Sequence, residues 1–163
     1  ASRGAGMGLN LGLLKELFGS KLIESGDYRG DLWIQIRAED LLPVIDQLRT
    51  DPKLKFDWFV DLCGVDYLGK HPRFETVVHL RSMELGHQIR VRCQVPDESL
   101  TVPSLTGFWP AANWQEREAY DMYGIRFQGH PNLTRILNSP GTEEFPQRKD
   151  YPLRGKREPK EKP

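Results

Sequence analysis

The feature that most constrains this chain is a set of segments in which apolar and polar residues alternate one by one. The clearest is residues 88–95, where Ile, Val and Cys alternate with Gln and Arg. Residues 74–81 and 32–37 follow the same rule, and residues 21–27 form a weaker candidate. Residues 56–63 are a further strand candidate. Their alternation puts four apolar residues on one face: Phe56, Trp58, Val60 and Leu62. A period of two is typical of strands with one face on a core, so the sequence predicts a sheet with one apolar face.

Two segments have the spacing of helices, one before the first strand candidate and one between residues 37 and 56. In residues 9–18, leucines and a phenylalanine recur every three or four positions, and Gly19 ends the run. In residues 38–49, apolar residues again share one face, and Pro43 falls in the first turn, where a missing N–H costs nothing. Residues 83–87 suit a hairpin turn between two strands. The order helix, two strands, helix, three strands predicts an α+β fold, a two-layer sandwich in which helices cover one face of a mostly antiparallel sheet.

The sequence changes character after the last of these strands. Residues 96–110 are rich in Pro, Ser and Thr and predict a loop with a short helix near residues 102–108. Residues 113–123 then predict a helix, which Asn113 and Glu116 would begin as a capping box.

Gly124 follows that helix as its expected left-handed end residue. Beyond it there is little periodicity, and the six prolines from Pro131 to Pro163 predict an extended segment. We therefore divide the chain into a flexible N-terminus (1–8), an α+β domain that includes the helix 113–123 (9–125), and an extended partner-binding segment with a tail (126–163).

Composition disfavours several classes of function. The formal net charge is 0, whereas a general nucleic-acid binder needs a surplus of Lys and Arg. No run of about 18 apolar residues is present for a membrane span. Residues 1–10 lack the apolar region of a secretory signal, and Met7 is the expected natural start. We expect no nucleic-acid partner, and membrane contact only through other proteins.

No constellation of residues predicts a catalytic, cofactor-binding or metal site in this chain. Cys63 and Cys93 are too few for an iron–sulfur cluster and too far apart in sequence for a zinc motif. The alternation places Cys93 on the apolar face, where a thiol is inert. The glycines of residues 4–8 have no strand before them, as a phosphate cradle needs, and the four histidines are scattered.

The charged residues of the helix 113–123 have two possible interpretations. Glu116, Glu118 and Asp121 are carboxylates that could serve acid–base chemistry, but the sequence shows no pocket that would shift a pKa. Arg117 and Asp121 are four positions apart and are expected to pair on the surface. We therefore interpret this segment as a charged helix packed at an interface between proteins.

The run from Asn113 to Leu137 carries a pattern that points to a family. It resembles the signature of the 30 kDa (C) subunit family of respiratory complex I, in the elements Glu116-Arg117-Glu118, Tyr120-Asp121, Tyr123-Gly124-Ile125, Phe127, Gly129-His130-Pro131 and Arg135-Ile136-Leu137. The strand end Asp61–Tyr67 and the run Arg148–Leu153 resemble two further elements of the same family. The resemblance covers residues 10–153.

The resemblance implies a non-catalytic structural or assembly subunit in the peripheral arm of a proton-translocating NADH:quinone oxidoreductase. Such a chain packs on the 49 kDa (D) subunit near the quinone module, with the B, I and G subunits nearby. It binds no cofactor, since FMN and the iron–sulfur clusters belong to partner subunits, and the enzymatic activity belongs to the complex. The implied location is the cytoplasmic side of the bacterial inner membrane, or the mitochondrial matrix side or chloroplast stroma. The equivalent subunit of a membrane-bound hydrogenase or a ferredoxin-dependent quinone reductase stays open as an alternative.

The resemblance also implies which residues contact the partner. These are Glu116, Arg117, Glu118, Asp121, Gly124, His130, Pro131, Arg135, Arg148, Asp150 and Tyr151. In this hypothesis the chain after Phe127 lies across a neighbouring subunit. Arg117, Arg135 and Arg148 then pair with carboxylates of that neighbour. The region Trp109–Leu153 is accordingly expected to be completed by a second polypeptide.

Overall fold

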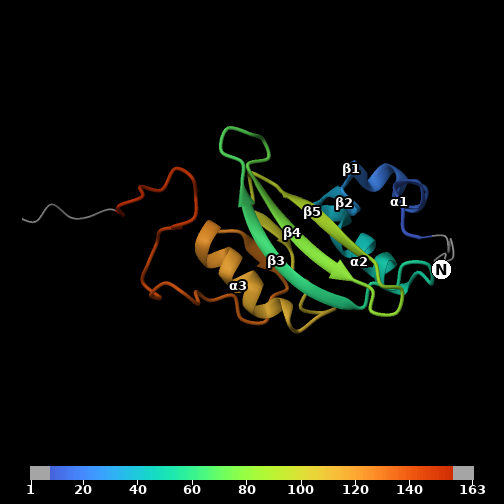
Figure 1. Cartoon of the computed structure of the whole chain (residues 1–163). Helices are drawn as coiled ribbons and strands as arrows, with labels where there is room; N and C mark the ends of the chain where they lie inside the picture. Colours follow the sequence, from blue (N-terminus) through green and yellow to red (C-terminus); the bar gives the residue numbers. More distant parts are fainter. Residues whose placement is uncertain (1–7, 156–163) are drawn as a thin grey trace, which may run out of the picture.

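The computed structural model describes residues 8–155, which are organised by one five-stranded sheet (Figure 1). In chain order its elements are α1 (Leu11–Phe18), η1 (Gly19–Lys21), β1 (Leu22–Tyr28), β2 (Asp31–Arg37), η2 (Ala38–Asp40), α2 (Leu41–Thr50), β3 (Trp58–Asp66), β4 (Phe74–Arg81), β5 (Gln88–Val95), β6 (Thr101–Pro103), α3 (Ala112–Tyr123) and β7 (Arg126–Gln128). The sheet order is β1-β2-β5-β4-β3, with β2 and β5 parallel and the other neighbours antiparallel. The predicted α+β fold and its order of helices and strands are confirmed. Most of the predicted N-terminal part and the end of the tail lie outside the described residues.

Helices α1 and α2 close the core on one side of the sheet. Leu14 and Phe18 from α1 are buried, as are Ile45 and Leu48 from α2, and they join one apolar cluster with strand residues such as Ile34. The helical spacing seen in the sequence puts these side chains on one stripe of each helix. Because each buried side chain of this size contributes about 1.5–3 kcal/mol, this cluster fixes the helices against the sheet.

Strand β3 contains a bulge, which overturns part of the predicted alternation. Its register against β4 shifts between Phe59 and Asp61, so Val60 is an extra residue in the strand. The extra residue moves the inward positions by one, and Phe59 is buried while Trp58 and Val60 are 56% and 47% exposed. The prediction that Trp58 and Val60 face the core is therefore wrong.

The short helix predicted near residues 102–108 is wrong as well. Val102 lies in β6 and pairs in parallel with Phe127 of β7, and the N–H of Ser104 continues the pairing by donating to Gln128 O at 2.8 Å. A helix of so few residues is marginal by itself. The β-branched segment instead gains hydrogen bonds from a strand that lies far along the chain.

Helix α3 covers the free edge of the sheet at β3 (Figure 1). An edge strand leaves one row of backbone groups without a strand partner. Here the side-chain oxygen of Gln115 accepts the N–H of Leu62. The ring of Tyr123 packs on Gly64, where a Cβ would lie 2.6 Å from it. These contacts place α3 beside the sheet and set the position of the candidate site.

The two ends of α3 test the predicted caps. The helix begins at Ala112, after a cap residue whose side chain makes no hydrogen bond. The predicted capping box of Asn113 and Glu116 is therefore wrong, because the Glu116 carboxylate binds the preceding loop instead. At the other end, Gly124 has a φ of 81° and is left-handed, which confirms its predicted role.

Candidate functional site

The candidate site consists of α3 and the segment that crosses it, residues 129–155, which we call the strap. The strap has no helix or strand of its own, and it runs outward beyond α3 and the sheet (Figure 1). Side chains of α3 and of the sheet hold its backbone in place. Most of the residues that carry the resemblance to the family lie on α3 and the strap.

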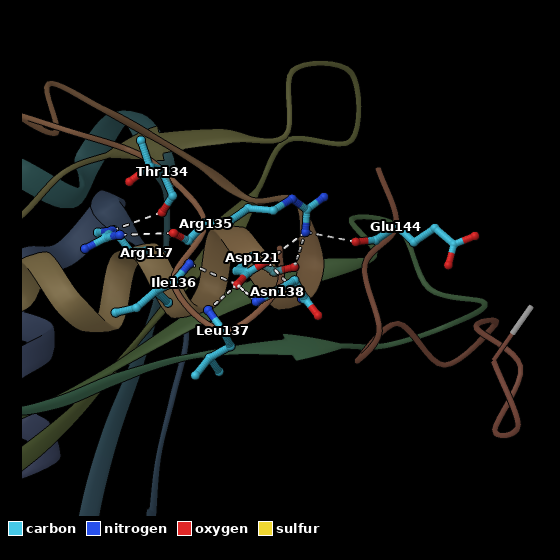
Figure 2. A network of polar contacts seen from close by, with 8 residues as sticks. All are labelled: Arg117, Asp121, Thr134, Arg135, Ile136, Leu137, Asn138 and Glu144. Carbon is cyan, nitrogen blue, oxygen red and sulfur yellow. Dashed lines mark hydrogen bonds and ion pairs between the residues drawn. The ribbon is translucent and has the colours of Figure 1, made fainter. Parts of the chain in front are cut away.

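Asp121 of α3 is the main anchor of the strap (Figure 2). Its side chain is fully buried. Oδ1 accepts hydrogen bonds from Arg135 Nη1 at 2.7 Å and from Asn138 Nδ2 at 2.9 Å. Oδ2 accepts the backbone N–H groups of Ile136, Leu137 and Asn138 at 3.1, 2.7 and 2.9 Å. One carboxylate therefore binds two side chains of the strap and the backbone of three consecutive strap residues.

Arg135 completes this anchor. Its side chain is 9% exposed, and Nη1 also donates to the carbonyl oxygens of Asp121 and Glu144 at 3.1 and 3.0 Å. Its guanidinium lies over the ring of Phe145, 4.9 Å from the centroid. Burial alone raises the pKa of Asp121, but hydrogen bonds from Asn138 and Arg135 outweigh it and hold that pKa well below its ordinary value.

The predicted surface pair of Arg117 with Asp121 is wrong. Both residues face the strap, as their spacing of four requires, but Asp121 is buried and bonded to Arg135. Arg117 instead donates from Nε to Thr134 O and from Nη2 to Arg135 O, each at 3.0 Å (Figure 2). Its guanidinium also lies over the Trp114 ring at 5.3 Å. Arg117 thus binds strap backbone rather than a carboxylate.

A second part of the strap packs on the end of α3 at Gly124. Arg148 Nε donates to Tyr123 O at 2.8 Å. Its guanidinium lies between two rings, 4.6 Å from the centroid of Phe145 and 5.2 Å from that of Phe74. A Cβ on Gly124 would lie 2.8 Å from Arg148 Nη2 and 2.9 Å from the Phe145 ring. Glycine is needed here both for its left-handed backbone and for this close approach.

A second anchor ties the far part of the strap to the sheet. Asp66, at the end of β3, accepts two hydrogen bonds from Arg73, both at 2.8 Å, and one from Lys149 N–H at 2.7 Å. Arg73 also holds the carboxylate of Asp150, at 2.7 and 3.1 Å. The hydrogen bonds from Arg73 lower the pKa of Asp66. The forked geometry of a guanidinium suits this bridge between two carboxylates.

His130 and Tyr151 make shorter-range contacts in the strap. Nδ1 of His130 accepts the N–H of Asn132 at 3.0 Å, so the ring proton is on Nε2, which is directed at Asn113 O at 3.2 Å. The hydroxyl of Tyr151 donates to a carboxylate oxygen of Glu144 at 2.9 Å. These contacts fold the strap onto itself and onto the start of α3.

Glu116 is buried on the side of α3 that faces the domain. Its Oε1 accepts the N–H of Leu105 and its Oε2 accepts the hydroxyl of Ser104, both at 2.6 Å. Burial raises its pKa to about 7, and the two hydrogen bonds offset this only in part. Glu116 therefore closes the loop between β6 and α3 and is uncharged over much of the acidic range.

Glu116 makes the stability of the fold depend on pH. Between its ordinary pKa of 4.5 and the folded value of about 7, the unfolded chain releases the proton that the folded chain keeps. The free energy of unfolding should therefore fall as pH rises from 4.5 to 7, by about 3 kcal/mol. Glu116→Gln should remove this part of the slope in urea unfolding measured from pH 5 to pH 8. Glu118→Gln, an exposed change on the same helix, should keep it, and equal slopes in both variants would contradict the assignment.

The structure brings the predicted site residues together but changes the role of the arginines. Arg117, Arg135 and Arg148 all donate to groups of their own chain. Each of them therefore has a partner within its own chain. Their pairing with carboxylates of a neighbour, and the completion of the region Trp109–Leu153 by a second polypeptide, stay predictions. Glu118 and Pro131, in contrast, are exposed.

Five residues that complete the anchors are not predicted by the sequence patterns. These are Asp66, Arg73, Asn138, Glu144 and Phe145. Asp66 lies inside the run Asp61–Tyr67, whose resemblance to the family was noted, so part of the signal was present. The others carry no local pattern, because their partners lie elsewhere along the chain.

The described residues offer little sign of metal or thiol chemistry. Within residues 8–155, no group of three or more His, Cys, Asp or Glu could hold a metal ion. No helix of this part of the chain is long and apolar enough to cross a bilayer. Cys93 lies on the apolar face as predicted, and burial raises its pKa to about 12. Partial burial also raises the pKa of Cys63, so neither thiol is activated as a nucleophile.

Comparison with known proteins places this geometry in a family. Residues 34–157 match the model of the respiratory-chain NADH dehydrogenase 30 Kd subunit. The chain is 50% identical over 126 residues to the NADH-quinone oxidoreductase C subunit of Hyphomonas neptunium, covering 77% of this chain and 62% of that protein. It is 48% identical over 132 residues to the same subunit of Roseiflexus sp., covering 81% and 76%. The chain thus spans less than two thirds of the first of these relatives.

Two solved structures share the fold. Nqo5, solved as a trypsin-resistant fragment (1–134), is 32% identical with a TM-score of 0.66, covering 74% of this chain and 96% of that one. A chain of the membrane-bound sulfane sulfur reductase, an archaeal respiratory membrane complex, has a TM-score of 0.70 at 23% identity, covering 87% and 85%. Both likenesses support the α+β fold of the described residues. The chain belongs to the respiratory-chain NADH dehydrogenase 30 kDa subunit family, in which its relatives are the C subunits of NADH-quinone oxidoreductases.

Proposed function

We propose that this chain is a non-catalytic structural subunit of a proton-translocating NADH:quinone oxidoreductase and packs on the 49 kDa subunit near the quinone module. Its family membership supports the assignment to the complex. In this proposal, FMN and the iron–sulfur clusters belong to partner subunits, and the B, I and G subunits lie nearby. The chain reaches the cytoplasmic side of the membrane only through the complex.

The observation that carries the proposal is a pair of exposed apolar side chains, one on α3 and one on the strap. Trp114 is 62% exposed and Leu137 is 65% exposed. Trp114 is on the same helical face as Arg117 and Asp121, and both of these bind the strap segment that contains Leu137. Exposed aromatic and aliphatic side chains with a polar surround are typical of protein interfaces. Because the anchors already order this surface, little conformational entropy is lost when a partner binds.

Removing the two exposed side chains should weaken assembly without unfolding the chain. We expect Trp114→Ala combined with Leu137→Ala to lower the recovery of the 49 kDa subunit about tenfold or more, since buried interface tryptophans commonly dominate binding. The measurement is quantitative mass spectrometry of complexes purified through a tag on the full chain. Leu42→Ala, an exposed apolar change on α2, is the matched control. Normal recovery of the 49 kDa subunit with the double variant, at an unchanged melting temperature, would refute the interface.

The same purification tests which complex contains the chain. Recovery of the flavin subunit that oxidises NADH supports the proposed assignment. Recovery of a nickel–iron hydrogenase subunit in its place would assign the chain to the related complex that the sequence resemblance left open.

A further inference from the structure

The face of the sheet opposite α1 and α2 carries a groove that the proposed function does not use. The groove has a volume of about 410 Å³, and its lining includes Trp33, Tyr67 and Arg90 together with Val65 and Val77. Helices α1 and α2 pack on the other face, and α3 lies at the β3 edge. The groove therefore lies on a different surface from the strap.

Three residues of the groove, Trp33, Arg92 and Tyr67, are held by contacts within the chain, and the charge of Arg92 is neutralised. The ring of Trp33 lies against Gly26, where a Cβ would come within 2.6 Å of it. The guanidinium of Arg92 lies over that ring, 4.9 Å from the centroid, and is paired with the buried Glu75 at 2.9 Å. The hydroxyl of Tyr67 is 3.4 Å from Arg92 Nη2. These contacts hold two aromatic rings in fixed positions before any partner arrives.

Beside Trp33, on the neighbouring strand β5, the groove presents a guanidinium that is not paired with a carboxylate. Arg90 is exposed, and its Nε donates to Nε2 of His79 at 2.9 Å. His79 therefore has its proton on Nδ1, which lies 3.1 Å from the carboxylate of Asp61. Among the residues described, no carboxylate lies within ion-pair distance of Arg90. The remaining donors of this fork are available to an anion in the groove.

We propose that this groove docks an acidic segment of a partner polypeptide, with a carboxylate on Arg90 and an apolar side chain against Val65 and Val77. The inference rests on the proposed function, since the partner is another subunit of the same complex, but it assigns a second contact surface. A polypeptide fits better than a nucleic acid because, of the two guanidinium groups that line the groove within residues 8–155, Arg92 is paired and Arg90 alone is not. Two carboxylates, Glu75 and Asp61, also lie close by.

A zero-length carbodiimide cross-link in the assembled complex tests the proposal. Arg90→Lys puts a primary amine in the groove, and carbodiimide joins an amine only to a carboxylate in direct contact. We expect a new cross-linked peptide between position 90 and an Asp or Glu of another subunit. The matched control is Arg37→Lys at the end of β2, where Glu39 is 3.9 Å from the guanidinium. Its new link should reach only that residue of the same chain.

Charge reversal provides a second readout. Arg90→Glu should lower recovery of the cross-linked subunit about tenfold, since like charges then face each other, while Arg37→Glu leaves it unchanged. A link from position 90 only to Asp61, only to a second copy of this chain, or to nothing in an intact complex would overturn the proposal. The 49 kDa subunit would still be recovered in those cases, so the proposed function would stand. Its absence from complexes of the parent chain would instead defeat the proposed function.

Discussion

Asp121→Asn should release the strap from α3 while the α+β domain stays folded. The amide is similar in shape, but it cannot accept all the hydrogen bonds that the carboxylate accepts, and it leaves Arg135 as a buried charge without its counter-ion. Removing one partner of a buried ion pair costs about 3–5 kcal/mol, which raises the population of the open strap roughly a hundredfold or more. Hydrogen exchange of the amides of Ile136, Leu137 and Asn138, followed by mass spectrometry, measures this opening directly.

Asp150→Asn is the matched control for this variant. It makes the same chemical change in the strap, but at a carboxylate that is 54% exposed, so exchange at the Asp121 anchor should stay as in the parent. The pH dependence has a definite sign. Since the folded pKa of Asp121 lies below its ordinary 3.8, its stabilisation is present above that pH and is lost as pH falls further. The gap between parent and variant should therefore be widest near neutrality, and no gap at neutral pH would show that other contacts hold the strap.

Local patterns predicted the strands β4 and β5 and the C-terminal ends of α1 and α3, but not the elements that depend on contacts between distant segments. The alternation in residues 88–95 identified β5, and Gly124 marked the end of α3, because each depends on neighbours in sequence. Val60 broke the pattern because a bulge depends on the partner strand. Val102 was assigned to a helix because its strand partner lies beyond α3, where no local period could reveal it.

In the candidate site, the sequence likewise predicted which residues meet but not which partners they bind. The sequence located Arg117, Arg135 and Asp121 correctly on the segments that meet. It paired Arg117 with Asp121 because a spacing of four allows that contact. In the fold, Asp121 is buried, and a buried carboxylate needs several donors at once. Arg135 and the backbone of the strap supply these donors. Such a pairing depends on tertiary structure and has no local sequence signal.

Two carboxylates on α3 illustrate how the surroundings decide the charge state. Glu116 and Asp121 are both buried. Glu116 receives two hydrogen bonds and no cation, so burial prevails and its pKa rises to about 7. Asp121 receives Arg135 and several backbone N–H groups, so its pKa falls. The Glu116 side of the helix therefore loses stabilisation as pH rises from 4.5 to about 7, and the Asp121 side loses it as pH falls below 3.8. The attachment of α3 should be strongest between pH 3.8 and 4.5.

Gly124→Ala should be strongly destabilising, because it combines a strained backbone with a steric clash. Gly124 has a φ of 81°, and a residue with a Cβ pays about 1–2 kcal/mol in this left-handed conformation. The new methyl would also meet the Phe145 ring and Arg148 at under 3 Å, and such overpacking adds about 1–3 kcal/mol. We expect a total loss of about 2–5 kcal/mol in urea unfolding, together with faster exchange in the strap.

Gly129→Ala separates the two contributions. Gly129 also has a left-handed backbone, with a φ of 86°, but a Cβ there would meet nothing within 4 Å. Its substitution should therefore cost only the backbone part, about 1–2 kcal/mol. The difference between the two variants measures the packing of Phe145 and Arg148 on the end of α3, which is the contact that fixes the strap beyond the Asp121 anchor. If the two variants lose equal stability, the packing of Phe145 and Arg148 on Gly124 does not stabilise the strap, and its outer half is held by its hydrogen bonds to Tyr123 and Asp66 and by the Arg73 bridge.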